Sequence, residues 1–333
     1  MSNKILEKSI LSTLVYYDVL DYPLTAQEVF KFLINLERLQ KDQGSTFLQI
    51  QGQTLNEINS SLDILVKSRV LGEKNGFYFL SGKENLYHER IEKNKIAEMK
   101  WKKTRRYLFL VQAVPYIEAI FASGSLALGH TNKESDLDVL VVAKAGRIWL
   151  VRILISLMMT VLGVRRKNKE RVAPDKICLN HYITTDSLRI SFESLYTAQG
   201  YAHLIPLYWK NKIVIENFWK VNRPWMEKFL GCWGWSYGYQ RRAVRSSRLL
   251  GWVKFVLEKI LDQTRLADWL EKVCRKIQIK RINTNLPGRI TISDRQLEFH
   301  PYSAEKDIIK KYNSAIFKLG IFGDYQETDS GLR

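Results

Sequence analysis

The pattern of apolar and polar positions divides the chain into helical and strand-like segments. Apolar residues recur at helical spacing over 5–20, whereas short, mainly apolar runs, bounded by glycine or polar residues, occupy 117–122, 139–142 and 177–183. The first pattern predicts an amphipathic helix and the second predicts buried strands. An α+β fold is therefore expected, with a mixed sheet at its centre and helices around it.

The N-terminal segment predicts three helices followed by a short strand. The helices are expected over 5–20, 26–33 and 55–67. Thr25 precedes the second helix and Glu28 stands three residues later, which is the spacing of a capping box. A strand is expected at 76–80. This order of elements resembles winged-helix modules, so residues 1–83 are expected to form a winged-helix domain.

The two central apolar runs carry the residues with candidate chemistry. Gly124 and Ser125 follow the first run, and Asp136 and Asp138 precede the second. Alternate residues of a strand share a face, so the two aspartates are expected together. Adjacent carboxylates repel each other unless a cation lies between them, and a divalent cation with oxygen ligands meets that need. Gly124 permits close approach of a ligand, and Ser125 offers a hydroxyl and an N–H to a phosphate oxygen.

This combination resembles the nucleotidyltransferase superfamily related to DNA polymerase β, whose signature is Gly-Ser followed by Asp-x-Asp on the next strand. The resemblance implies that Asp136 and Asp138 hold two Mg²⁺ ions and that Gly124 and Ser125 grip a nucleoside triphosphate. It also implies transfer of a nucleotidyl group to a hydroxyl, with release of pyrophosphate, between two metal ions. The alternative is a strand-turn-strand whose paired aspartates have no ligand. A winged helix joined to such a domain resembles a group of uncharacterised bacterial proteins.

The strand at 177–183 departs from the superfamily pattern. The corresponding strand usually supplies a third carboxylate, whereas here it offers Asn180, which is a neutral ligand and a poor base. Asp175, two residues before the strand, is the alternative third acid. Two interpretations follow. The protein is an active transferase whose metal shell Asn180 or Asp175 completes, or a degenerate domain that binds nucleotide or nucleic acid as a regulator.

The chain is strongly basic, with 52 Lys and Arg against 34 Asp and Glu and a formal net charge of +18. This balance favours a polyanionic partner. The residues expected to bind nucleic acid are Lys100, Lys102, Lys103, Arg105 and Arg106, in a helix predicted over 84–114, and Arg165 and Arg166. Both clusters border the proposed site, and the third N-terminal helix carries Glu57 and Asp63, so RNA is favoured over specific DNA. Arg147 and Arg152 are expected either to reach the triphosphate or to pair with local acids.

An apolar stretch at 148–164 is shorter than the roughly 20 residues of a membrane span and contains Arg152. We interpret it as a largely buried core helix, and the alternative is an interfacial helix. The three cysteines, Cys178, Cys232 and Cys274, fit neither a disulfide framework nor zinc-ligand spacing, and the five histidines are equally dispersed. Free thiols and a cytoplasmic location are expected, since no signal peptide is visible.

The C-terminal region is rich in tryptophan and arginine. Helices are expected from 195 toward 207, over 249–279 and over 304–319, with a hairpin at 289–299. Tryptophans such as Trp225, Trp233, Trp235, Trp252 and Trp269 either stack on single-stranded nucleic acid or form an aromatic core. The expected domains are 1–83, a nucleotidyltransferase domain with its basic lead-in helix at 84–205, a mostly helical domain at 206–322, and a disordered tail at 323–333.

Overall fold

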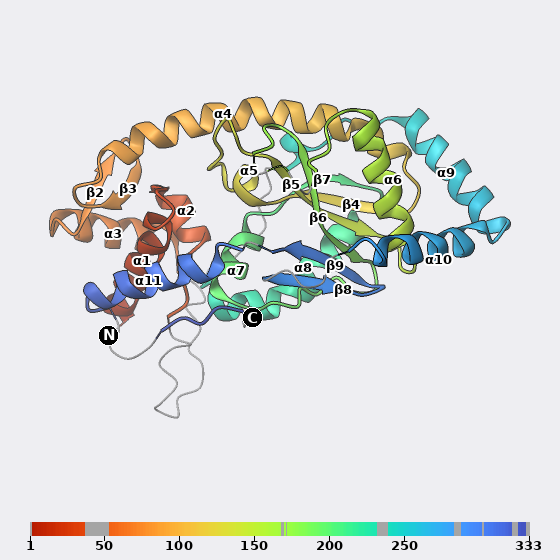
Figure 1. The fold of residues 1–333 in the computed structure, drawn as a ribbon. Helices are drawn as coiled ribbons and strands as arrows, with labels where there is room; N and C mark the ends of the chain where they lie inside the picture. Colours follow the sequence, from red (N-terminus) through yellow and green to blue (C-terminus); the bar gives the residue numbers. More distant parts are fainter. Residues whose placement is uncertain are drawn as a thin grey trace.

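The N-terminal module combines helices with a small antiparallel sheet (Figure 1). The computed structural model describes residues 2–36, 53–167, 170, 172–231, 239–282, 288–301, 303–321 and 326–330. The elements of the module are α1 (Ser2–Asp18), β1 (Leu24–Thr25), α2 (Ala26–Lys31), α3 (Leu55–Lys67), β2 (Leu71–Lys74) and β3 (Phe77–Leu80). The strands pair in the order β1-β3-β2, so β3 lies at the centre of this sheet.

The helix starts in this module follow the sequence prediction. Thr25 and Thr54 each accept a hydrogen bond from the backbone N–H of the glutamate three residues later, and both capping boxes are complete. Strand β3 confirms the strand expected at 76–80. The apolar pattern does not predict β2, because Leu71 is its only large apolar residue. This strand forms because it pairs with β3 along its whole length.

A six-stranded sheet lies at the centre of the molecule, with the strand order β7-β4-β5-β6-β9-β8. Its strands are β4 (Ile117–Ala122), β5 (Leu137–Ala143), β6 (Ile177–Thr184), β7 (Ile205–Trp209), β8 (Arg289–Ile292) and β9 (Gln296–His300). Strands β5 and β6 are parallel and are connected through α6 (Ile148–Val161), whereas the other neighbours are antiparallel. The strands and the hairpin predicted from the sequence are confirmed.

The sheet takes strands from both sides of the boundary expected between residues 205 and 206. Strand β7 pairs with β4, and the hairpin of β8 and β9 extends the sheet beyond β6. The helix expected to run from 195 toward 207 ends earlier, as α7 (Leu195–Ala202). The segment after residue 205 is therefore not a separate helical unit in the described residues, because its strands complete the central sheet.

Helices surround both the sheet and the N-terminal module. The remaining elements are α4 (Asn85–Tyr107), the 3₁₀ helix η3 (Leu108–Ala113), α5 (Gly124–Leu128), α8 (Lys212–Phe229), the 3₁₀ helix η4 (Tyr239–Arg242), α9 (Arg248–Gln263), α10 (Leu266–Ile279) and α11 (Glu305–Lys318). Figure 1 shows α4 extending from the N-terminal module along one side of the sheet. The helix predicted over 249–279 is divided into α9 and α10 at Arg265, whose backbone φ is 53°.

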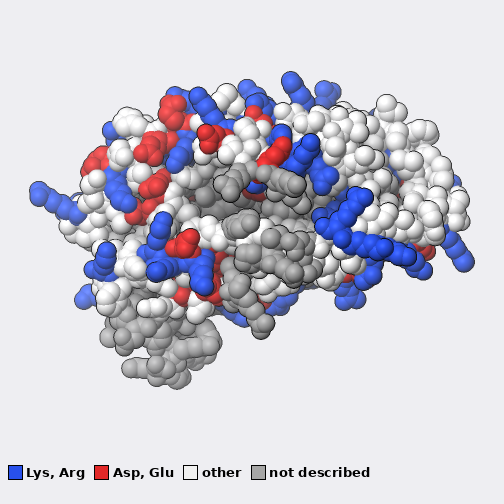
Figure 2. Space-filling view, in the orientation of Figure 1, with Lys and Arg blue, Asp and Glu red and all other residues white. Residues whose placement is uncertain are grey.

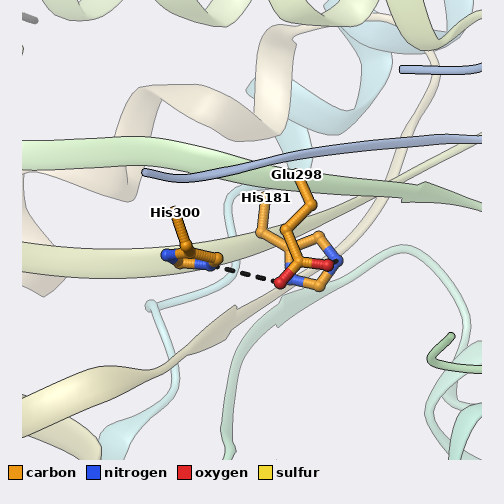
Figure 3. A group of neighbouring side chains, drawn as sticks. All are labelled: His181, Glu298 and His300. Atoms are coloured by element: carbon orange, nitrogen blue, oxygen red, sulfur yellow. Dashed lines mark ion pairs between the residues drawn. The ribbon is translucent and has the colours of Figure 1, made fainter. Parts of the chain in front are cut away.

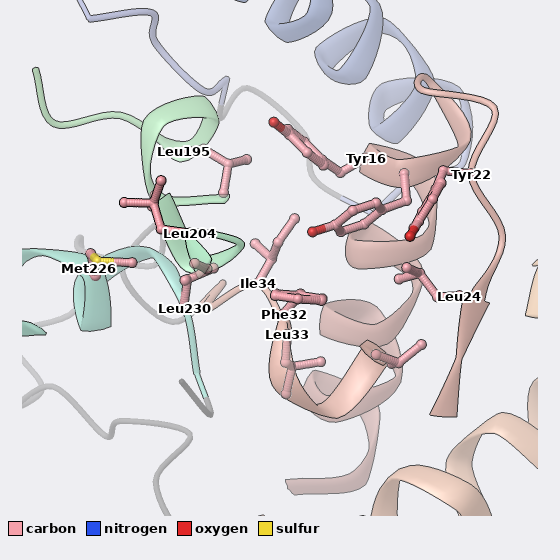
Figure 4. Close-up of a cluster of buried hydrophobic side chains, with 14 of the residues drawn as sticks. Tyr16, Tyr22, Leu24, Phe32, Leu33, Ile34, Leu195, Leu204, Met226 and Leu230 are labelled. Carbon is pink, nitrogen blue, oxygen red and sulfur yellow. The ribbon is translucent and has the colours of Figure 1, made fainter. Parts of the chain in front are cut away.

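Alternate residues of β5 enter two hydrophobic cores, one on each face of the sheet. Leu140 and Val142 belong to the first core, together with residues of α1, α7, α8 and α11. Val139 and Val141 belong to the second, together with residues of α4, α6 and α10. Figure 4 shows part of the first core, in which Phe32 of the N-terminal module lies among residues from α7 and α8. The N-terminal module and the sheet therefore share one core.

Helix α6 is buried along its first half and exposed toward its end. Trp149 and Val151 are buried, whereas Leu157 and Val161 are 59% and 79% exposed. The stretch expected to be a largely buried core helix is thus buried mainly in its first half. Among the described residues, no helix combines the length and the apolar character needed to cross a membrane.

Part of the polar tail expected to be disordered has defined contacts. The Asn313 side-chain amide donates to the carbonyl oxygen of Glu327 at 2.8 Å, and the Ser330 hydroxyl donates to the Glu305 carboxylate at 2.9 Å. Residues 326–330 therefore lie against α11, because polar side chains of that helix supply hydrogen-bond partners.

The C-terminal tryptophans occupy different environments. Trp225 is buried, whereas Trp252 on α9 and Trp269 on α10 are exposed. Trp233, Trp235 and Cys232 lie outside the described residues. Cys178 and Cys274 are free thiols, as expected.

Candidate active site

The turn after β4 and the start of β5 meet at one end of the sheet. Ala122 pairs with Val139, and the Ser123 N–H donates to the carbonyl oxygen of Asp138 at 3.0 Å. Gly124 follows with a backbone φ of +62°, in the left-handed region. A Cβ atom added to Gly124 would lie 2.4 Å from Asp138 Oδ2. Glycine is therefore needed here, both for the backbone conformation and for close packing against the carboxylate.

The two aspartates lie together, as the sequence predicts. Ligand atoms of Asp136, Asp138 and Cys178 all lie within 4.8 Å of one another. Burial, followed by the nearby charge of Asp136, raises the pKa of Asp138. The Asn180 amide donates to Asp138 Oδ1 at 3.2 Å. The site therefore concentrates negative charge where burial makes that charge costly.

Arg166 supplies positive charge at this site. Its guanidinium forms an ion pair with Asp136 and lies 3.9 Å from Cys178 Sγ. The Arg166 N–H also donates to the carbonyl oxygen of Ile177 at 3.0 Å, which fixes the crossover segment against β6. The sequence prediction assigned Arg166 to nucleic acid, whereas the structure places it on a site carboxylate. No local signal reveals this, because the contact depends on how the crossover folds back.

The donor set fits a divalent cation with oxygen ligands. Asp136 and Asp138 offer carboxylate oxygens, and the absence of a side chain at Gly124 leaves the Asp138 carboxylate room at the turn. Burial, followed by the charges of Asp138 and Asp136, raises the pKa of the Cys178 thiol, so this group is neutral. A neutral thiol is a poor ligand for Mg²⁺, and the cation would rest on the oxygens.

The described residues bring no third carboxylate into this group. Cys178 and Asn180 are the β6 residues that lie beside Asp138. Asp175 is held elsewhere, since Lys100 donates to it at 2.8 Å and Lys103 pairs with its other oxygen. Burial acts to raise the pKa of Asp175, but the hydrogen bonds from the two lysines lower it overall.

A comparison with protein families finds a match in this part of the chain. Residues 107–180 match the family model described as a nucleotidyltransferase domain. The match supports the superfamily. It runs from the end of α4 into β6 and includes Gly124, Ser125, Asp136, Asp138 and Asn180, while β7, β8 and β9 lie outside it. No curated protein and no solved structure matched the chain.

Two arginines of the matched segment lie away from the aspartates. Arg147 follows the far end of β5, roughly 17 Å along the strand from Asp138, and pairs with Asp268 at 2.7 Å. Arg152 donates to Gln278 at 2.6 Å, and its guanidinium lies 4.8 Å from the ring centre of Phe299. Of the two expectations for these arginines, Arg147 follows the second, because it pairs with a local acid. Arg152 contacts Gln278 and Phe299.

The basic residues of α4 have different environments. Lys100 is buried and donates to the carbonyl oxygen of Ser135 at 2.7 Å, besides its bond to Asp175. It fastens α4 to the segment before Asp136, so its expected contact with nucleic acid is wrong for this conformation. Arg105 donates to the carbonyl oxygen of Arg241.

Other predicted nucleic-acid residues remain accessible. Lys102 and Arg106 are exposed on α4, and Arg165 is partly buried beside β6. Figure 2 shows Lys and Arg side chains spread over one face of the molecule and interspersed with acidic ones.

Proposed function

We propose that the protein takes a nucleotidyl group from a nucleoside triphosphate and transfers it to a hydroxyl, with release of pyrophosphate. The observation that carries the proposal is the meeting of Gly124, Asp136 and Asp138 within the segment that matches the nucleotidyltransferase domain. Asp136 and Asp138 would hold two Mg²⁺ ions, with the amide oxygen of Asn180 as a further ligand. When bound, these ions supply the positive charge that stabilises the attacking and leaving oxygens.

The residues of the turn would position the triphosphate. Gly124 is exposed and Ser125 is half-buried at the start of α5, so a backbone N–H and a hydroxyl are accessible beside the aspartates. Both groups donate to phosphate oxygens in the arrangement we propose. Arg166 balances Asp136 and would have to move when cations occupy the site, because both seek the same carboxylate.

The transfer itself forms one bond and breaks another. The acceptor oxygen bonds to the α-phosphorus, the bond from that phosphorus to the bridging oxygen breaks, and pyrophosphate takes the electron pair. The hydroxyl proton needs a base. Asn180 cannot accept it readily, and Asp175 is engaged by Lys100 and Lys103. We therefore expect slow transfer, since general-base assistance is typically worth ~10²–10⁴-fold.

The missing third carboxylate favours a second candidate function. In this alternative the domain binds a metal-nucleotide without turnover and acts as a regulator. The N-terminal module would then be the part of the regulator that contacts its partner. Its elements follow the order expected of a winged helix, and we propose that fold for it. The exposed side chains of α3 include Glu57, Asp63 and Lys67, which suits a protein contact better than duplex DNA.

RNA is the acceptor or ligand class that we propose. The net charge of +18 supports a polyanion, and Lys102 and Arg106 are exposed on the helix that borders the site. Trp252 and Trp269 are exposed on α9 and α10, where stacking on unpaired bases is sterically open.

Incubation with each labelled nucleoside triphosphate tests the proposal. Total RNA, protein and small metabolites would be offered in turn with Mg²⁺, and wild type would be compared with the double variant Asp136→Ala, Asp138→Ala. Label transfer by wild type alone supports the enzyme. Mg²⁺-dependent nucleotide binding without transfer supports the regulator. Equal calorimetric affinity for nucleotide in wild type and the double variant would sink both.

A further inference from the structure

Three side chains with metal-ligating atoms meet on neighbouring strands β6 and β9 (Figure 3). His181 pairs in register with Glu298, and His300 follows two residues later, so all three lie on one face of the sheet. His181 Nε2 lies 3.9 Å from Glu298 Oε2, and His300 Nε2 lies 3.6 Å from Glu298 Oε1. The two imidazoles therefore approach different oxygens of one carboxylate.

We propose that His181, Glu298 and His300 form a binding site for a transition-metal ion of the zinc class. Two imidazoles and one carboxylate are a donor set that binds zinc while leaving a fourth position open. Ligands about 2.0–2.2 Å from a tetrahedral ion lie ~3.3 Å from one another. The two Glu298–histidine separations are 3.6 and 3.9 Å, and all three ligand atoms lie within 4.8 Å of one another, so the side chains would have to draw together around an ion.

Burial and charge both favour a cation at this position. The Glu298 side chain is 1% exposed, and its Oε2 atom has no hydrogen-bond partner among the described residues. A buried carboxylate oxygen without a partner is costly, and a metal ion would supply the missing partner. Arg289 Nε lies 3.5 Å from Glu298 Oε1, but the same guanidinium also faces Glu305 at 3.8 Å. One arginine thus balances only one of two buried acids.

The outer nitrogen of each imidazole has a fixed partner. The Tyr201 hydroxyl lies 2.9 Å from His181 Nδ1, and the Asn180 amide lies 3.3 Å from His300 Nδ1. The Tyr201 hydroxyl can accept the Nδ1–H of His181, as the outer partner of a metal-binding histidine does. The Asn180 amide nitrogen is itself a donor, so His300 could bind the ion through Nε2 only if this amide turned its oxygen toward Nδ1. Burial lowers the pKa of His181, and it lowers the pKa of His300 to about 4, so both rings are neutral at pH 7. The neutral ring is the form that binds metal.

The proposed zinc site adjoins the aspartate site. Asp138 and Leu140 share a face of β5, and Leu140 pairs with His181, so both sites lie on the same face of the sheet. The Asn180 amide nitrogen lies 3.2 Å from Asp138 Oδ1 and 3.3 Å from His300 Nδ1. A metal ion on His300 would therefore fix the residue that stands in place of the third acid. Occupancy of the zinc site does not depend on nucleotidyl transfer, so the two proposals can fail separately.

Metal binding to the full chain tests the inference. The protein would be stripped with a chelator and titrated with Zn²⁺ against a chromophoric competitor, and with Co²⁺ to record the visible absorption of a tetrahedral ion. A single zinc ion per chain is expected. Because His181 is buried, the test variants are His300→Gln and Glu298→Gln, which nearly preserve side-chain volume. Each should weaken zinc binding by ~100-fold or more, since loss of an outer partner alone typically costs ~10–100-fold.

Two control variants locate the ion. His88 is exposed outside the cluster, so His88→Gln should leave zinc affinity unchanged. Cys178→Ser removes the thiol that lies beside Asp136 and Asp138, and it should also leave the zinc affinity unchanged. Loss of zinc in Cys178→Ser with retention in His300→Gln would place the ion on the aspartates and overturn the inference. Folded wild-type protein that binds no zinc at micromolar free metal would also overturn the inference, and the three residues would then be a buried polar cluster without a metal.

Discussion

At the scale of single residues, the candidate site depends on the packing of the Asp138 carboxylate against the backbone of Gly124. Gly124 combines a left-handed backbone with a close approach to Asp138. Asp136 adds a second negative charge, and Arg166 provides part of the compensation. Because two partly buried acids share one cationic side chain, a divalent ion would supply the positive charge that the site still lacks.

Alanine substitutions at Gly124 and Gly146 distinguish the cost of backbone strain from the loss of nucleotide binding at the site. Gly124→Ala should cost about 1 kcal/mol of stability through its positive φ, and its Cβ should displace the Asp138 carboxylate. Gly146 offers a matched control, because its φ is +70° and a Cβ there would meet nothing within 4 Å. Both variants should lose similar stability in denaturant unfolding, and only Gly124→Ala should lose Mg²⁺-dependent nucleotide binding in calorimetry. Equal nucleotide affinity in the two variants would contradict this account.

The β6 position beside Asp138 controls the expected rate. Asn180→Asp should restore a base and raise pyrophosphate release by ~10²-fold or more. Asp175→Asn should change the rate little, because Asp175 already binds Lys100 and Lys103. A large loss of rate in Asp175→Asn, with no gain in Asn180→Asp, would identify Asp175 as the base instead. No turnover in any of the three proteins, with nucleotide binding intact, would favour the regulator.

At the scale of elements, α4 connects the N-terminal module to the site. Arg90 near its start pairs with Glu28 of α2 at 2.6 Å, and Lys100 binds the segment that leads into Asp136. Lys103, one turn later, holds Asp175 before β6. Some basic residues of this helix therefore bind other parts of the fold, whereas Lys102 and Arg106 remain exposed.

Neighbouring lysines of α4 should respond differently to substitution. Lys100→Met should destabilise the fold by about 3 kcal/mol, because it removes the buried partner of Asp175 and leaves backbone carbonyls unpaired. Lys102→Met should change stability by less than about 0.5 kcal/mol, since the side chain is exposed. Denaturant unfolding of both variants measures the difference. Similar free energies of unfolding would mean that the Lys100 contacts contribute nothing.

At the scale of the whole molecule, one hydrophobic core connects the N-terminal module, the sheet and the last helix. Tyr16 of α1 contacts Tyr312 of α11 with ring centres 5.7 Å apart, and both belong to the core that includes Leu140 of β5. Movement of the module relative to the site would therefore require part of this core to repack. The basic side chains, by contrast, are spread over the face of the molecule shown in Figure 2.

The overall charge predicts salt-dependent binding of RNA. Affinity should fall by ~10³-fold or more between 50 and 200 mM salt if several phosphates are contacted. Lys102→Ala with Arg106→Ala should weaken binding and reduce the salt slope. Lys67→Ala with Arg69→Asn, at the end of α3, is the control, and asparagine tolerates the φ of 60° at Arg69. An affinity that does not vary with salt, or a larger loss in the α3 variant, would refute this placement of the RNA.

The sequence by itself determined the features that depend on near neighbours. The capping boxes at Thr25 and Thr54 follow from residues three apart. Asp136 and Asp138 lie together because alternation along a strand is fixed by the backbone. The Gly-Ser and Asp-x-Asp pattern likewise indicated the superfamily that the family match supports, since its residues lie within one short segment.

Only the tertiary structure decided which distant segments meet. Strand β7 and the hairpin of β8 and β9 joined the central sheet because β4 and β6 offered them hydrogen-bonding edges, and no local pattern encodes that choice. The same long-range pairing brought His300 to Asn180, which precedes it by 120 residues, and the crossover brought Arg166 to Asp136. Apolar periodicity reports which side of an element is buried. It does not report what covers that side, because the covering residues are selected by sheet order and packing rather than by sequence distance.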